Sequence, residues 1–213
     1  MTEQFIKERG RKLGEIVVKN LQRRHFGAYF CETGEQAKQL ALSLIPKGDT
    51  VSWGGSMTMQ QLGLLDAIKS TYRFIDRDSA STPQQREELT RSALICDTFL
   101  MSANGISEDG QLVNIDGNGN RAAAMIYGPK NIILIAGMNK VVKTVQDALT
   151  RARTIAAPMN MQRFGDQNTP CSKTGGCGDC TTTDCICCYE VITRVCRPAG
   201  KIKVILVNET LGF

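Results

Sequence analysis

The distribution of hydrophobic residues along the chain predicts one long helix followed by a regular alternation of strands and helices. In the N-terminal segment, apolar side chains recur at the spacing of an amphipathic helix, which we expect to cover residues 1–24. Short apolar runs then indicate strands at 27–31, 50–53, 72–75, 97–103, 131–136 and 203–208. Helical patterns separate them at 33–45, from 58 onward, and at 83–94, 120–127 and 141–157.

This alternation predicts an α/β fold with a mostly parallel sheet and flanking helices. The run Ile132 to Ala136 is continuously apolar, as expected for a strand that is covered on both faces. The dipeptide Asp109-Gly110 between two apolar runs predicts an added β-hairpin over residues 105–115. We expect a single domain over residues 1–213, with a cysteine-rich segment at 165–200 between the last helix and the last strand.

Composition narrows the class of protein. Hydrophobic residues make up 42% and charged residues 22%, which is typical of a globular chain. The net charge is +5, but the basic residues are scattered and not interleaved with aromatics, so we expect no nucleic-acid partner. We find no apolar run near the roughly 18 residues of a membrane span, and no secretory signal in residues 1–12. We therefore expect a cytoplasmic protein, in which clustered thiols favour metal binding or redox chemistry over disulfides.

The first candidate ligand site follows the strand at 50–53. Gly54 and Gly55 let a ligand approach the backbone closely, and Ser56 and Thr58 add hydroxyl groups at the start of a helix. Free N–H groups at a helix start favour an anion such as a phosphate or carboxylate. The turn is neither a Walker loop nor a GxGxxG motif. The structural alternative is a tight turn in which Ser56 or Thr58 caps the helix.

A second glycine-rich loop precedes the helix at 120–127. Asparagine and glycine tolerate positive φ, so a structural turn explains much of it. Arg121 opposes the helix dipole and is better explained by an anion bound nearby. We expect Lys140, after the strand at 131–136, to close the same crevice, with a solvated lysine as the alternative. The loop residues predicted to bind the ligand are Asp116, Gly117, Asn118, Gly119, Asn120 and Arg121.

Glu108, in the expected hairpin, is the candidate general acid or base, and an exposed turn residue is the alternative. His25 is the only histidine and lies at the end of the first helix beside two arginines. A histidine-centred catalytic triad and a histidine-rich metal site are therefore not expected.

The cysteine-rich segment is the second candidate site. Seven of the nine cysteines lie between residues 171 and 196, and Cys177 and Cys180 form a CxxC pair that can grip one metal ion. The later CxCC spacing fits no common zinc pattern, so zinc, an Fe–S cluster and reversible dithiols all stay open. Cys31 and Cys96 are expected to be buried, inert thiols. The predicted metal ligands are Cys171, Cys177, Cys180, Cys185, Cys187 and Cys188.

Taken together, these motifs resemble the LUD family, the lactate-utilisation domain. The resemblance rests on residues 51–58, 97–106, 110–121 and 200–206. It implies the fold of the sugar-phosphate isomerase and CoA-transferase superfamily, a parallel α/β sheet with an added hairpin. It also implies a role in the oxidation of L-lactate to pyruvate beside Fe–S partner proteins.

Three hypotheses about function follow. The first is an accessory protein or subunit of lactate or organic-acid oxidation, which binds a small anion and a metal or Fe–S centre. The second is a transferase or isomerase that acts on a phosphorylated or CoA-linked substrate, with Glu108 as acid or base. The third is a non-catalytic redox or metal sensor.

Overall fold

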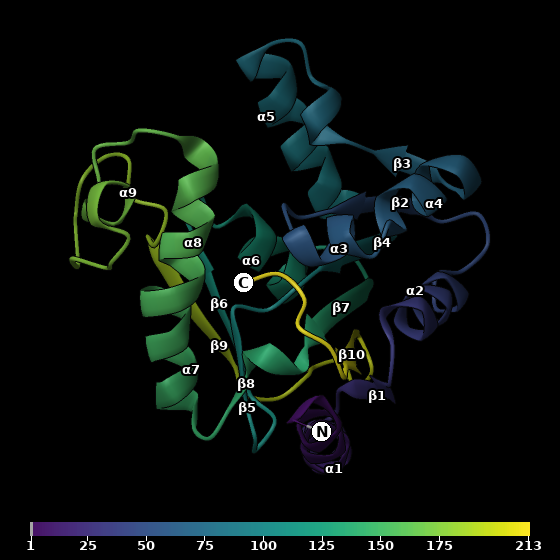
Figure 1. The fold of residues 1–213 in the computed structure, drawn as a ribbon. Coiled ribbons are helices and arrows are strands. Elements are labelled where there is room, and N and C mark those ends of the chain that lie inside the picture. Colours follow the sequence, from purple (N-terminus) through teal and green to yellow (C-terminus); the bar gives the residue numbers. More distant parts are fainter. Residues whose placement is uncertain (1) are drawn as a thin grey trace.

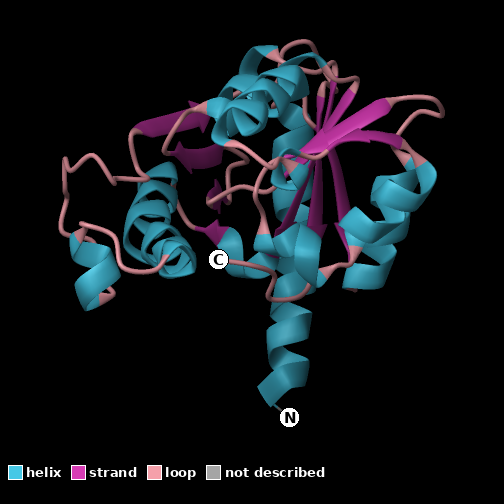
Figure 2. Ribbon diagram, turned by 90° about the horizontal axis from the view of Figure 1, so that it is seen from above, coloured by secondary structure: helices cyan, strands magenta, loops and turns pink. Residues whose placement is uncertain are grey.

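The computed structural model of the protein describes residues 2–213 and begins with the expected long helix. Helix α1 (Thr2–Arg23) buries Gly10, Gly14, Val17 and Leu21 on one side. A Cβ atom on Gly14 would lie 2.2 Å from a ring carbon of Phe30, so glycine is what lets α1 approach the sheet this closely. The N-terminal end of α1 projects beyond the rest of the molecule (Figure 2).

The main sheet has six strands, all parallel, as the alternation of elements predicted (Figure 1). The strand at the centre of the sheet beside β4 and β10 is β7, the apolar run of the sequence. In spatial order the strands are β1 (Gly27–Cys31), β10 (Ile202–Val207), β7 (Asn131–Gly137), β4 (Thr98–Met101), β2 (Thr50–Trp53) and β3 (Arg73–Ile75).

Helices cover both faces of this sheet. Along β7, Ile132 and Leu134 belong to one hydrophobic core, and Ile133 and Ile135 belong to the other. The first core lies against α1 and α6 (Asn120–Tyr127). The second lies against α2 (Gly34–Ser43), α3 (Met57–Gln61) and α4 (Leu64–Thr71). The single helix expected from residue 58 onward is thus divided in two, at Gly63, which adopts a positive φ of 57°.

Between β3 and β4 the chain forms a helical arm. A short 3-10 turn, η1 (Arg77–Ser79), precedes α5 (Pro83–Ser92), and η2 (Ala93–Ile95) follows it. Thr82 caps α5 by accepting a hydrogen bond from the backbone N–H of Gln85, and Pro83 lies in the first turn, where proline is favourable. Figure 1 shows α5 standing away from the sheet on the side opposite α1.

A second sheet of four strands carries the expected hairpin. Strands β5 (Gly105–Ser107) and β6 (Leu112–Asp116) are antiparallel, with β8 (Val141–Val142) beside β5 and β9 (Tyr189–Thr193) beside β6. The predicted helix at 141–157 was wrong at its start, because the two valines extend the sheet. The capping box of Thr144 and Asp147 begins α7 (Val145–Arg151) instead. Strand β9 was not predicted.

The helix that follows β8 is continuous but not uniform. After α7 comes a π-helical turn, η4 (Ala152–Ala156), then α8 (Ala157–Met161) and the 3-10 turn η5 (Gln162–Phe164). The π turn directly precedes Pro158, whose ring would collide with the carbonyl group of residue 154 in a regular α-helix. The short α9 (Pro170–Thr174) then opens the cysteine-rich segment, and η3 (Met138–Lys140) links β7 to β8.

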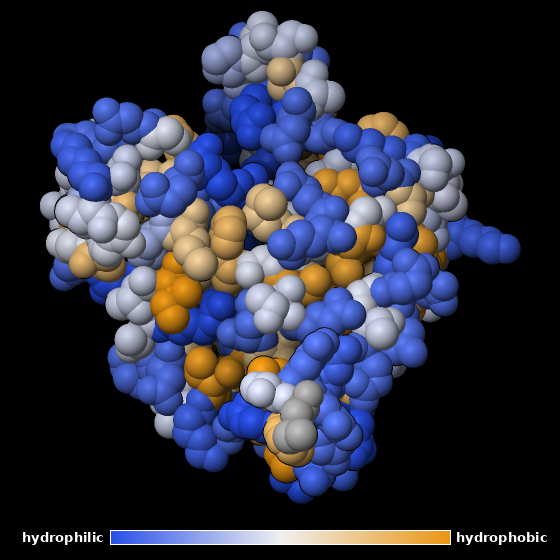
Figure 3. All heavy atoms as spheres, in the orientation of Figure 1, coloured by the Kyte–Doolittle hydropathy of each residue, from blue (hydrophilic) through white to orange (hydrophobic). Residues whose placement is uncertain are grey.

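Every helix within residues 2–213 is too short or too polar to cross a lipid bilayer. Hydrophilic side chains cover most of the face drawn in Figure 3, and its apolar areas are small and separate.

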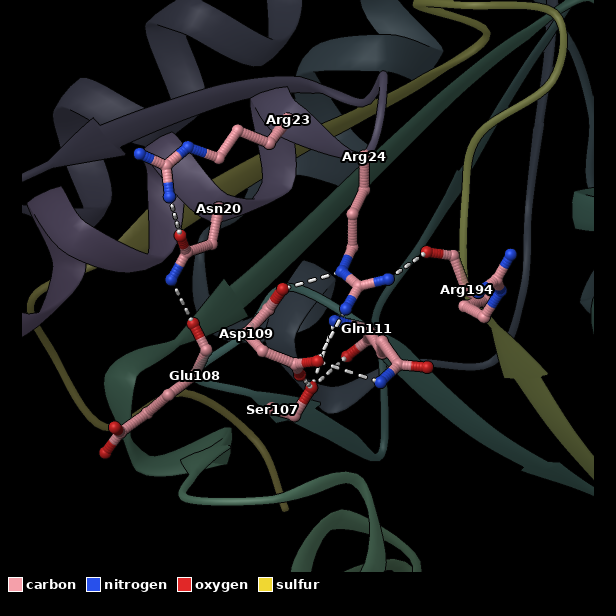
Figure 4. A network of polar contacts seen from close by, with 8 residues as sticks. All are labelled: Asn20, Arg23, Arg24, Ser107, Glu108, Asp109, Gln111 and Arg194. Carbon is pink, nitrogen blue, oxygen red and sulfur yellow. Dashed lines mark hydrogen bonds and ion pairs between the residues drawn. The ribbon is translucent and has the colours of Figure 1, made fainter.

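The hairpin is held against the end of α1 by polar contacts (Figure 4). Arg24 donates to the backbone carbonyl of Asp109 and to its carboxylate, both at 2.6 Å. Asn20 donates to the carbonyl of Glu108 at 2.8 Å. Gly110, at φ +88°, lies so near α1 that a Cβ atom would come within 2.8 Å of the backbone of Asn20 and Leu21. The hairpin therefore packs on α1 without any side chain between their backbones.

We predict that Gly110→Ala destabilises the protein more than Gly48→Ala does. Gly48 has almost the same φ, +90°, but no described atom within 4 Å of the added Cβ. Gly48→Ala should therefore lower the free energy of unfolding only by the strain of a positive φ, about 1 kcal/mol. Gly110→Ala adds a collision with backbone, for a total of about 3 kcal/mol. Urea unfolding followed by circular dichroism measures both, and equal losses of unfolding free energy would contradict the close packing.

Candidate functional site

Both glycine-rich turns open on one cavity, at the carboxyl ends of β2 and β4. The cavity has a volume of about 450 Å³ and reaches from Gly54 across to Gly117. Ligand sites of open parallel sheets lie at this end of the strands. Figure 3 shows hydrophilic side chains where α5 and α8 face each other. The predicted ligand residues that line the cavity are Gly54, Gly55, Ser56, Asp116, Gly117, Asn118, Arg121 and Lys140.

Three predicted ligand residues, Thr58, Gly119 and Asn120, are not among the residues that line the cavity. Thr58 is fully buried and accepts a hydrogen bond from Lys140. Gly119, at φ +73°, precedes α6 and packs on Tyr189, and Asn120 is the first residue of that helix. Ser56 precedes α3 but makes no capping hydrogen bond with its side chain, so the capping alternative does not apply to Ser56.

The two glycines of the first turn make room for two arginines. A Cβ atom on Gly54 would lie 2.9 Å from Cδ of Arg121, and one on Gly55 would lie 2.9 Å from Nη2 of Arg77. Both arginines line the cavity. The pair of glycines therefore brings guanidinium groups against the backbone at the end of β2.

Arg121 has a partner within the protein. Its guanidinium group forms an ion pair with Asp116 at 2.9 Å and donates to Asn104 Oδ1 at 2.8 Å and to the carbonyl of Ile115 at 2.7 Å. Asp116 also accepts from the backbone N–H of Ala122 at 2.6 Å. Asp116 therefore supplies the negative charge next to Arg121 that the sequence suggested would come from a bound anion. The ion pair also joins the second glycine-rich loop to the hairpin.

Arg77, which the sequence reasoning missed, is less well satisfied. Its Nε is buried and has no hydrogen-bond partner within residues 2–213, and its nearest carboxylate oxygen, on Asp78, is 3.9 Å away. Burial lowers the pKa of Arg77; the carboxylates of Asp78 and Asp116 oppose this shift in part, and the positive charges of Arg86 and Arg121 add to it. An anion in the cavity would offset this lowering. One signal in the sequence pointed to Arg77, which lies two residues after the strand predicted at 72–75. Ligand sites lie at the carboxyl ends of parallel strands.

Lys140 is the most deeply buried cation of the cavity, with 3% of its surface exposed. Its Nζ donates to Ser102 Oγ at 2.9 Å and to Thr58 Oγ1 at 3.2 Å. Burial lowers the pKa of Lys140 to about 7, and the charges of Arg151 and Arg121 contribute in the same direction. Lys140 is thus not the solvent-exposed lysine that was the alternative interpretation of the sequence.

Glu108 lies away from this cavity. Its carboxylate pairs with the exposed Lys143 at 2.6 Å, beside α1 at the turn of the hairpin. The structure does not bring Glu108 together with Lys140, Arg77 or Arg121.

The cysteine-rich segment encloses a second cavity of about 610 Å³ against α8. Cys185 lines both cavities, and a Cβ atom on Gly117 would lie 3.3 Å from Cα of Ile186. The two candidate sites are therefore neighbours. The second cavity is lined by all six predicted metal ligands, Cys171, Cys177, Cys180, Cys185, Cys187 and Cys188.

The thiols of this cavity influence one another. Burial raises the pKa of Cys187 to about 12, and Cys185 and Cys177 add to the shift. Within residues 2–213, no three side chains of His, Cys, Asp or Glu are gathered closely enough to hold a metal ion. Cys31 and Cys96 are buried as expected, and burial raises the pKa of each thiol.

We predict that the buried amine of Lys140 makes stability rise with pH. Between about pH 7 and the pKa of an unfolded lysine, the unfolded chain holds a proton that the folded chain lacks. The free energy of unfolding should therefore increase by up to about 1.4 kcal/mol per pH unit in this range, and not below it. Lys140→Met should remove this contribution and Lys143→Met, at the exposed neighbour, should keep it. Urea unfolding at pH 7, 8 and 9 measures the slope, and equal slopes in all three proteins would refute it.

Comparison with known proteins agrees with this architecture. The model of the LUD domain matches residues 14–207. Among solved structures, the fold is similar to the crystal structure of a DUF162 family protein from Deinococcus radiodurans, with a TM-score of 0.52 and 10% identity over 93% of this chain and 98% of that one. No curated protein sequence matches the chain. Because the family model spans nearly all of its sequence, the chain belongs to the LUD domain family.

Proposed function

We propose that the protein binds a small organic anion in the cavity between Gly54-Gly55-Ser56 and the loop at 116–121. The observation that carries this proposal is Arg77, which lines the cavity and whose buried Nε has no hydrogen-bond partner within residues 2–213. A buried donor without a partner costs about 1–3 kcal/mol, so the described chain leaves this charge incompletely satisfied. Arg and a carboxylate also match in geometry, because the planar fork of the guanidinium binds two oxygens at once.

The charges around the cavity favour the same type of ligand. The cavity is lined by Arg77, Arg86, Arg121 and Arg163, besides Lys140, whose pKa of about 7 leaves it only partly charged at neutral pH. The carboxylates in the lining are fewer: Asp78 pairs with Arg86 at 2.8 Å, Asp116 pairs with Arg121, and Asp184 accepts from the backbone N–H of Asn168. A surplus of positive charge in a concave, partly dry site concentrates small anions.

The cysteine cavity supports the proposal of a metal or Fe–S centre beside this site. Thiolates are the ligands that zinc and iron–sulfur clusters prefer, and six of them line one cavity. The donor chemistry thus fits, although the sulfurs would have to move together to form a closed set. Arg153 already holds this segment on η4, through ion pairs with Asp179 and with Glu190. A bound cluster would supply one-electron transfer, and zinc would order the segment.

Together these features suit an accessory protein or subunit in the oxidation of lactate or another small organic acid. The arginines would hold the carboxylate group, and Cys185 places the thiol cavity next to it. This role, and Fe–S proteins as partners, is our proposal on the basis of family membership and of these two adjoining cavities.

We predict that L-lactate binding depends on Arg77. Arg77→Gln removes a charged hydrogen-bond donor, so its Kd for lactate should rise about tenfold or more. Arg91→Gln is the matched control, since Arg91 lies on the outer surface of α5 in an exposed pair with Glu87. Isothermal titration calorimetry, repeated with inorganic phosphate, measures the affinities. Equal affinities in the two variants would rule out Arg77 as the anchor.

We predict that the anaerobically prepared protein carries zinc or iron bound by the cysteine cavity. Cys177→Ser with Cys180→Ser should lower the metal content per chain at least severalfold, because thiolate ligands are lost. Cys96→Ala should not, because Cys96 lies in the main core and not at this cavity. Elemental analysis and acid-labile sulfide determine the content. Zinc and iron both well below one per chain, with an unchanged Tm after replacing all six cysteines by serine, would exclude a metal site.

A further inference from the structure

The hydrogen bonds around Lys140 account for two N–H groups and no more. Nζ donates to Ser102 Oγ and to Thr58 Oγ1. Both hydroxyls have a carbonyl to donate to, the Thr58 hydroxyl to Leu211 at 3.3 Å and the Ser102 hydroxyl to Ala103 at 3.4 Å. The hydroxyl oxygens are therefore free to accept from the lysine. Two hydroxyl partners match the two donors of a neutral amine, and the described chain offers no carboxylate that would favour an ammonium group.

Nζ of Lys140 and Oγ of Ser102 lie 2.9 Å apart, and the Ser102 hydroxyl also has the carbonyl of Ala103 as an acceptor at 3.4 Å. Lys140 lines the cavity, and the lone pair of its amine is the candidate nucleophile of this cluster. Its only charged neighbours that shift its protonation are cations, Arg151 and Arg121, and the described chain gives it no carboxylate partner.

Resting on the anion site proposed above, we propose that Lys140 is a nucleophile that forms a reversible imine with a 2-oxo carboxylate bound beside it. Nζ attacks the carbonyl carbon, and a proton moves from nitrogen to oxygen to give a carbinolamine. Loss of water then leaves a C=N bond between the substrate carbon and Nζ. The condensation consumes no oxidant or reductant, and the addition of water reverses it.

The arrangement of the cavity suits this class of ligand. A 2-oxo carboxylate carries a carboxylate group on the atom next to its carbonyl carbon. Arg77 and Lys140 line the same cavity and supply one binding group for each function. A lysine whose pKa burial lowers to about 7 is about half unprotonated at pH 7, and the unprotonated amine is the form that nucleophilic attack requires.

Reductive trapping tests the proposal. The protein is incubated with pyruvate and sodium cyanoborohydride, and the adduct is located by intact mass and peptide mapping. We expect one reduced adduct per chain, on Lys140 of the wild-type protein, which requires no variant to fold. Lys140→Met should abolish it and Lys143→Met, at the exposed lysine three residues away, should retain it. At subsaturating pyruvate, Arg77→Gln should lower the yield about tenfold.

The outcomes separate this inference from the proposed function. Adducts spread over exposed lysines, or a yield that Lys140→Met leaves unchanged, would overturn the imine. Arg77-dependent binding of lactate without any adduct on Lys140 would overturn the imine and leave the anion site standing. If neither lactate nor phosphate binds and no adduct forms, both proposals fail. A single adduct on Lys140 supports both.

Discussion

Burial of β7 on both faces is the constraint from which the rest of the architecture follows. Its alternate side chains enter two separate cores, so helices have to cover both sides of the sheet. The strand then ends in Gly137 and the short turn that carries Lys140. A Cβ atom on Gly137 would lie 2.4 Å from the carbonyl oxygen of Glu209, so the segment after β10 crosses directly over this turn. Lys140 is buried because the backbone of residues 209–211 covers the short turn that follows β7.

The cavity at the sheet's carboxyl edge follows from the same geometry and from the glycines of the first turn. Because Gly54 and Gly55 have no side chains, Arg121 and Arg77 can each lie close to the backbone of this turn. The result is a dense group of cations in which Asp116 neutralises Arg121 and leaves Arg77 and Lys140 without a carboxylate at hydrogen-bonding distance in the described chain. Like charges held together in this way cost stability. Such an arrangement is typical of functional sites, where stability is lost in exchange for affinity or reactivity.

Local signals in the sequence predicted most of the fold. The strands of the main sheet and the Asp109-Gly110 hairpin each depend on side chains within a few residues. What the sequence did not predict depends on pairing at a distance. Val141 and Val142 form a strand only because β5 lies beside them. Strand β9 pairs with β6 and lies in the cysteine-rich segment, where the sequence predicted metal ligands and no strand.

The candidate site shows the same division. The glycine turns and Lys140 were found because the carboxyl ends of strands can be recognised in a sequence. The partner of Arg121 was not found, although Asp116 is only five residues away, because the pairing requires the bend between β6 and α6. Arg77 was missed because η1 is short, and only the fold places it against Gly55.

The π turn of η4 fixes how the two cavities face each other. A π turn is equivalent to one residue inserted into an α-helix. Removing that residue would rotate everything after it by about 100° about the helix axis. Asn160 and Arg163, which follow the turn, would then leave the anion cavity, while Arg153, within it, would lose its alignment with the cysteine-rich segment. The one extra residue of the π turn thus aligns two walls that a regular helix would present in different directions.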